Sequence, residues 1–133
     1  MATKVTADDF FTGLLAGLAQ GETQVWSLRG SRFDAAVALA FDVFSEMAPL
    51  SNLDVMFRIR THKMHGDSVV VRDSLYSAAQ RDLVSLDNPE YQTVRLKIGR
   101  YDGSQLLEHV PGGPHVFSKI ADAFREAYEK QPA

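Results

Sequence analysis

The residues best suited to binding a ligand are cations that lie in two segments of alternating apolar and polar side chains, 53–60 and 93–98. Alternation with a period of two is typical of a strand with one buried face. The polar side chains of each segment should therefore project together from the opposite face. If the two strands are neighbours, that face gathers a set of cationic or titratable groups: Arg58, Arg60, His62, Arg95 and Lys97. These residues are the predicted ligand-binding site.

Such a cluster suits a phosphate, a carboxylate or an acidic protein surface, because guanidinium groups donate paired hydrogen bonds to planar anions. The same side chains also fit an ordinary solvated face of an amphipathic strand, or partners of acids on a terminal helix. Single-stranded nucleic acid is disfavoured, since aromatic side chains that could stack with bases are missing from this face apart from Tyr91.

A second candidate is the segment around His62, His65 and Asp67. Neutral imidazoles and carboxylates are common ligands of divalent ions. However, the segment coincides with a predicted hairpin turn, in which adjacent side chains need not converge and Gly66 supplies a positive φ. A turn is the preferred interpretation, and we predict neither a metal nor a cofactor.

A third candidate is the loop between His109 and His115, which contains a Pro-Gly-Gly-Pro run. Glycines before a helix can expose N–H groups to an anion. The spacing of a phosphate-binding loop is missing, so a loop that closes onto the last helix is the preferred interpretation.

Helices are predicted where apolar residues recur at three- and four-residue steps. The first begins at a Thr6 cap with an acid at Asp9 and ends near Gly21, and a short strand follows at 23–28. The next covers 33–47 and stops at Pro49, and the last begins at Pro114.

The middle of the chain predicts a hairpin of strands 53–60 and 68–71, a helix over 73–83, a strand over 93–98 and a turn at Asp102-Gly103. Together with the strand at 23–28 and the helix at 33–47, these elements have the order strand–helix–strand, strand–helix–strand, which matches a split βαβ arrangement. We therefore predict an α+β protein with a four-stranded antiparallel sheet, ferredoxin-like in topology, and additional N- and C-terminal helices. One face of that sheet needs a cover: the terminal helices, a second copy of the chain or another protein.

Composition favours one folded domain over residues 1–133, with 45% hydrophobic and 23% charged residues. The chain has no cysteine, which excludes disulfides and thiolate chemistry. The N-terminus carries acids where a signal peptide needs an apolar run, and the most apolar stretch, 35–44, is interrupted by Asp42 and too short to cross a bilayer. A cytoplasmic location without membrane attachment is expected.

The net charge of −3 weighs against non-specific nucleic-acid binding, although basic residues exceed acidic ones over 52–101. Because no catalytic constellation is recognisable, the preferred hypothesis is a non-enzymatic binding protein, a small acidic adaptor or regulatory partner. Its basic sheet face would bind an acidic protein or a small anion, and the chain would form a homodimer. The alternative is a small-molecule-binding protein or enzyme that uses His62 or His65 as a base and an arginine as an anion clamp.

Overall fold

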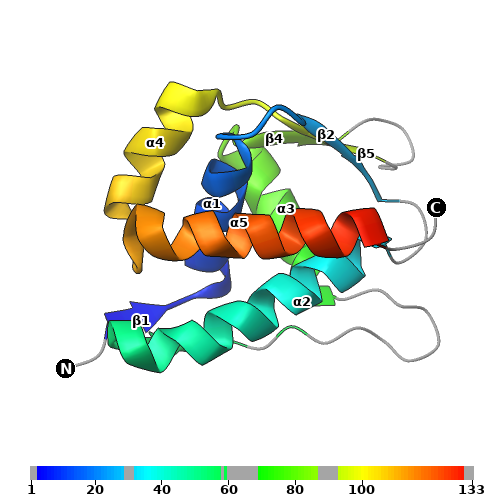
Figure 1. Ribbon diagram of the computed structural model, residues 1–133. Coiled ribbons are helices and arrows are strands. Elements are labelled where there is room, and N and C mark those ends of the chain that lie inside the picture. Colours follow the sequence, from blue (N-terminus) through cyan, green and yellow to red (C-terminus); the bar gives the residue numbers. More distant parts are fainter. Residues whose placement is uncertain (1–2, 29–31, 58, 60–68, 87–92, 131–133) are drawn as a thin grey trace.

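The computed structural model describes residues 3–28, 32–57, 59, 69–86 and 93–130 of the 133-residue chain (Figure 1). Within these ranges the chain forms helices α1 to α5, one 3-10 helix and two small sheets. The helices are Ala7–Leu18 (α1), Arg32–Met47 (α2), Val69–Gln80 (α3), Arg100–His109 (α4) and Gly113–Lys130 (α5), and the 3-10 helix is Ala48–Ser51. The strands are Thr3–Val5 (β1), Val25–Ser27 (β2), Leu53–Val55 (β3), Val84–Leu86 (β4) and Thr93–Leu96 (β5).

Helix α1 is the centre of the molecule. Every residue from Phe10 to Leu18 is buried, so this helix has no solvent-facing side beyond its first turn. It packs against α3, α4 and α5, and Figure 1 shows it lying behind α5 and between the other two. The predicted cap is confirmed: the Thr6 hydroxyl accepts from the Asp9 N–H, and the Asp9 carboxylate accepts from the Thr6 N–H.

Two glycines allow α5 to cross close to α1. A Cβ atom added to Gly13 would lie 2.5 Å from the ring of Phe117, and one added to Gly17 would lie 2.8 Å from the Phe117 carbonyl oxygen. Aromatic rings fill the space beside this crossing, since Phe10 contacts Phe44 with ring centroids 5.2 Å apart, and Phe44 stacks on Phe117 at 5.6 Å. The core therefore depends on small residues on one helix and large ones on its neighbours.

The two sheets lie at opposite ends of α1 (Figure 1). At one end, β1 pairs in parallel with β3. At the other, β5 is the central strand of an antiparallel sheet with the order β2-β5-β4. Trp26, Val94 and Val84 point from these three strands into the core and are nearly inaccessible to solvent.

The predicted four-stranded ferredoxin-like sheet is wrong. The strand at 53–55 pairs with β1 rather than with 68–71, and it belongs to a different sheet from β5. The predicted return strand is wrong at Val69–Val71, which begins α3 instead. β-branched residues disfavour a helix only weakly, and burial of Val71 at 0% exposure outweighs that preference.

The turn predicted at Asp102-Gly103 is also wrong, because both residues lie inside α4. A Cβ atom at Gly103 would lie 2.8 Å from the Ala16 carbonyl oxygen, so this glycine serves a close helix contact rather than a turn. The helices at 33–47 and from Pro114 are confirmed as α2 and α5, and the strands at 23–28 and 93–98 occur in shorter form as β2 and β5. None of the described helices is both long enough and apolar enough to cross a membrane.

We predict that Gly17→Ala destabilises the protein, although alanine is more favourable than glycine in a helix interior by about 1 kcal/mol. The new methyl group would collide with a main-chain oxygen of α5, which cannot rotate away, so the net loss in the free energy of unfolding should be about 1–2 kcal/mol. Urea unfolding followed by Trp26 fluorescence measures it. Gln105→Ala on the exposed side of α4 is the control and should change stability little; equal effects of the two substitutions would contradict the close crossing.

Candidate functional site

Two of the predicted site residues lie together on β5 and its extension. Buried and exposed side chains alternate along this segment: Val94 and Leu96 are buried, whereas Arg95 and Lys97 are exposed. Arg95 lies between Val25 of β2 and Ser85 of β4, its partners in the ladder. Both cations therefore belong to the outer face of the β2-β5-β4 sheet, the face that points away from the helices.

The other predicted site residues, Arg58, Arg60 and His62, lie outside the described residues, as do His65 and Asp67. The proposed grouping of all five site residues required strands 53–60 and 93–98 to be neighbours. Strand β3 ends at Val55 and is in the other sheet, so the sheet itself does not bring these segments together.

The two described cations differ in their pairing. The Lys97 Nζ lies 3.2 Å from the Asp82 Oδ1, and these side chains are 47% and 81% exposed, so water screens the pair strongly. Arg95 forms no ion pair with any described residue. Among the described residues, the outer face therefore presents the Arg95 guanidinium without an ion pair and the Lys97 ammonium group in an exchangeable surface contact.

The turn between α3 and β4 fixes the position of Asp82. The Leu83 N–H donates to the Ala78 carbonyl, 2.9 Å, and the Asp82 N–H donates to the Ala79 carbonyl, 3.1 Å. With Asp82 at a φ of 61°, this is a Schellman-type helix end. The chain therefore passes from α3 into β4 without a loop, and the strand starts beside the helix.

The free edges of the three-stranded sheet are not equivalent. On the β2 side, the Ser27 N–H donates to the Tyr128 hydroxyl at the end of α5, with N···O 2.9 Å. Tyr128 is itself held by Arg32, whose Nε donates to its carbonyl at 2.7 Å and whose guanidinium lies 4.0 Å from its ring centroid. Helix α5 therefore occupies the β2 edge at Ser27 through the Tyr128 hydroxyl.

On the β4 side, no part of the chain that the structure describes pairs with the edge. The Lys97 N–H donates to the Leu83 carbonyl on the β4 side, whereas the Leu96 N–H donates to the Gln24 carbonyl on the β2 side. Successive residues along β5 therefore bond alternately to β4 and β2. By the same alternation, Ser85 bonds toward β5, and the main-chain groups of Val84 and Leu86 point the other way. No described residue forms a main-chain hydrogen bond with these outward groups.

A surface groove of about 440 Å³ runs along this open edge. One wall is β4, and the other is the last two turns of α3. Its lining residues are Tyr76, Ala79 and Gln80 of α3, Val84, Ser85 and Leu86 of β4, and Lys97. The groove therefore combines an unpaired strand edge, an apolar helix wall and a cation.

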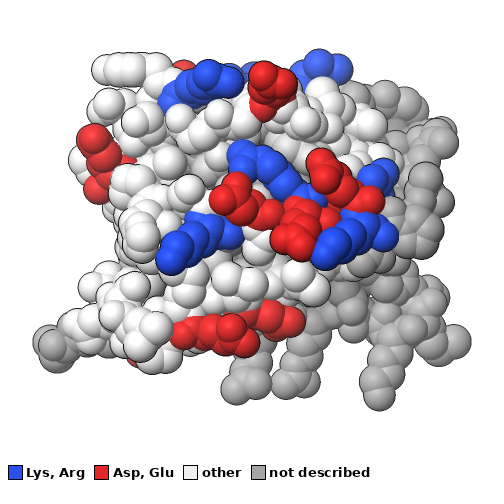
Figure 2. Space-filling model, viewed as in Figure 1, with Lys and Arg blue, Asp and Glu red and all other residues white. Residues whose placement is uncertain are grey.

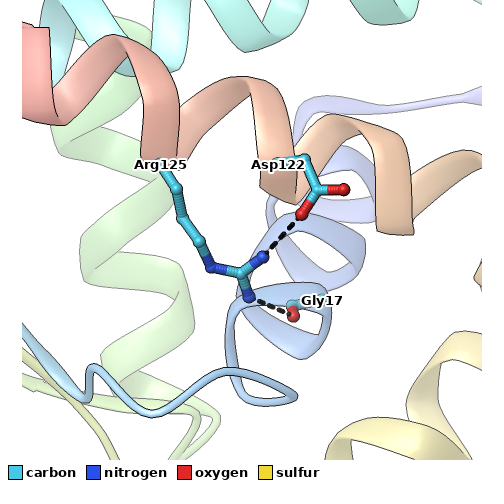
Figure 3. A network of polar contacts seen from close by, with 3 residues as sticks. All are labelled: Gly17, Asp122 and Arg125. Atoms are coloured by element: carbon cyan, nitrogen blue, oxygen red, sulfur yellow. Dashed lines mark hydrogen bonds and ion pairs between the residues drawn. The ribbon is translucent and has the colours of Figure 1, made fainter.

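A smaller cavity of about 260 Å³ lies between α1, α4 and α5, and Arg125 is its charged residue. Figure 3 shows that Arg125 is engaged: its Nη2 donates to the Gly17 carbonyl at 3.1 Å, and its Nη1 donates to Asp122 at 2.9 Å. Helix α1 has no basic residue in its last turn, so Arg125 supplies the positive charge that stabilises its C-terminus. This arginine has a structural role.

Figure 2 shows acidic and basic side chains intermingled over α5, with a row of acids below them over α2. One pair on α5 is Lys130 with Glu126, 2.7 Å apart. The hydrogen bond and the positive charge of Lys130 lower the pKa of Glu126. The face formed by α5 carries both positive and negative side chains, so it is not the basic surface that nucleic acid requires.

The described residues contain no group of three His, Asp or Glu side chains that could hold a metal ion. No protein-family model matches the chain, and comparisons with curated proteins and with solved structures find no match. Function therefore has to be inferred from the geometry of the described residues.

The groove was missed from the sequence because β4 was not predicted. The only signal was the alternation of Val84, Ser85 and Leu86, which is too short to distinguish a strand from a loop. The ladder that defines the edge is formed with β5, whose partner residues follow those of β4 by 8 to 12 positions (Val84↔Leu96, Ser85↔Arg95, Leu86↔Val94).

We predict that Tyr128→Phe lowers the free energy of unfolding by about 1 kcal/mol, because it removes the hydroxyl that accepts from the Ser27 N–H while keeping the ring. Amide hydrogen exchange at Ser27 should accelerate at the same time. Tyr101→Phe, at an exposed tyrosine of α4, is the matched control and should leave both quantities unchanged. Unchanged exchange at Ser27 in Tyr128→Phe would show that α5 does not cover this edge.

Proposed function

We propose that this protein is a non-enzymatic binding protein that docks an acidic protein partner on the outer face of the β2-β5-β4 sheet. The observation that carries the proposal is the exposed Arg95 on the central strand, without an ion pair in the described part of the chain and followed by Lys97 on the same face. A cation placed in the middle of a sheet face contributes to partner selection and to the rate of association.

The neighbours of Arg95 support this assignment. Val25 and Ser85, which flank it in the ladder, are short and half-buried. A partner can therefore approach the guanidinium group without displacing large side chains. Arginine is also the cation best suited to such contacts, because its planar group donates two parallel hydrogen bonds to a carboxylate.

The alternative, an enzyme or small-molecule site at His62 and His65, falls on residues outside the described ranges and gains no support from them. Among the described residues, the exposed cations of the sheet face support binding of an acidic protein. The homodimer and the cytoplasmic location stay predictions.

Photo-crosslinking tests the proposal. A photoreactive amino acid replaces Ser85, beside Arg95, and in a control protein it replaces Gln105 on the exposed side of α4. Expressed in the native host, the Ser85 derivative should form a specific adduct with an acidic protein, whereas the Gln105 derivative should not.

Once the adduct identifies the partner, Arg95→Ala combined with Lys97→Ala should weaken its binding about tenfold, since two exposed charges contribute roughly 0.5–1 kcal/mol each. Isothermal titration calorimetry measures the affinity. Lys4→Ala combined with Lys119→Ala removes two exposed cations elsewhere and is the charge-matched control. An equal loss in both double variants would mean that only the total charge matters and would refute the sheet face as the site.

A further inference from the structure

We infer that the partner contributes an extended acidic segment, which adds as a fourth strand to the open edge of β4 in the groove between β4 and α3. This inference rests on the proposed function and specifies how the sheet is used. It assigns the recognition to main-chain hydrogen bonds along β4, with Arg95 and Lys97 selecting for acidic side chains.

The open edge provides the hydrogen bonds. Val84 and Leu86 each present one N–H and one C=O group outward, because Ser85 between them bonds to β5. Alternate residues of a strand are about 6.8 Å apart, so these groups match the spacing of the main chain of an added strand. Unpaired edges of this kind are the usual acceptors of an added peptide strand.

Helix α3 lies opposite the β4 edge, and together they form a groove for one added strand. Ala79 has a short side chain, and Tyr76, one turn earlier, is 49% exposed, so both line the groove from the helix side. Side chains of an added strand alternate between the two faces of the sheet. One row would contact Tyr76 and Ala79, which favours apolar residues in that row.

The second row of side chains would lie on the outer face, beside Ser85. The described cations on that face are Lys97, which lines the groove, and Arg95, which is the ladder partner of Ser85. Aspartate or glutamate in this row could replace Asp82 as the partner of Lys97, because that surface pair is weak. The segment expected is therefore one of alternating apolar and acidic residues.

Charge also favours such a segment over a second copy of the chain. Antiparallel pairing of two β4 edges across a two-fold axis would place the Arg95 and Lys97 side chains of both copies on one outer face. Four cations would then share that face, with Asp82 of each copy as their nearest described acid. An acidic segment neutralises the same cations.

The test starts from a phage-displayed library of random dodecapeptides selected on the purified full chain. Synthetic fluorescent versions of the selected peptides are then measured by fluorescence anisotropy. We expect selected peptides that alternate apolar and acidic residues and bind in a salt-dependent manner. A failure to select any peptide, or selection of peptides without acidic residues, would overturn the inference.

The main-chain contact is tested by Leu86→Pro, with Leu86→Ala as the matched control. Proline removes the Leu86 N–H, which points into the groove, and leaves the hydrogen bonds between β4 and β5 in place. A proline at such an outward position of an edge strand is tolerated. Leu86→Pro should weaken peptide binding about tenfold relative to Leu86→Ala, which keeps the N–H group.

A second measurement does not depend on the folding of Leu86→Pro. Peptides are methylated at alternate main-chain nitrogens in the two possible registers and bound to the unmodified protein. One register should lose binding and the other should keep it, since only one edge of the added strand faces β4. Equal binding of both methylated registers would refute strand addition.

The outcomes separate the inference from the proposed function. If Arg95→Ala with Lys97→Ala weakens binding of the natural partner while Leu86→Pro does not, the partner docks on the outer face and strand addition is wrong. If analytical ultracentrifugation shows a dimer that Leu86→Pro converts to monomer, a second copy occupies the edge and the inference is also wrong.

Discussion

The burial of α1 beyond its first turn is the constraint on which the rest of this structure depends. A helix without a solvent-facing side requires neighbours all around it, and the chain supplies α3, α4 and α5 for that purpose. The close approach of α5 requires Gly13 and Gly17, because any side chain there would meet Phe117. The ends of the helix also need polar partners, which Thr6 with Asp9 provide at the exposed first turn and Arg125 provides at the C-terminal end.

The sheets are peripheral consequences of this helical packing. Each strand is only three or four residues long, so neither sheet could be stable without the helices behind it. The difference between the two edges of the β2-β5-β4 sheet follows from where the helices end. Helix α5 is long enough to bring Tyr128 over β2, whereas α3 ends before β4 begins and leaves that edge beside an open groove.

How much of this could be predicted from the sequence depended on the range of the interactions involved. The capping box at Thr6 and the apolar stripes of α2 and α5 are local, and those helices were predicted correctly. The predicted four-stranded sheet was wrong because alternation in 53–60 shows only that this segment can be extended and does not identify the strand with which it pairs. Its partner is β1, and the sequence of β1 gave no signal of a strand. Gly103 was taken for a turn residue because the Ala16 carbonyl, whose close approach requires a glycine there, is distant in sequence.

For the site, the sequence could predict that Arg95 and Lys97 point to the same outer face of a strand. The groove could not be predicted, because it depends on the three-residue strand β4, which is recognisable only from its pairing with β5.

The position of α1 also has a consequence for synthesis on the ribosome. Arg125 reaches Gly17 across 108 positions of sequence, and α5 covers the same helix. Until residues 113–130 have left the exit tunnel, a nascent chain that already contains α1 cannot bury it. At typical elongation rates of about 5–20 residues per second, this exposure lasts for several seconds. Helix α1 is thus exposed from its synthesis until α5 can cover it, and chaperones that recognise apolar helices should bind the nascent chain in that interval.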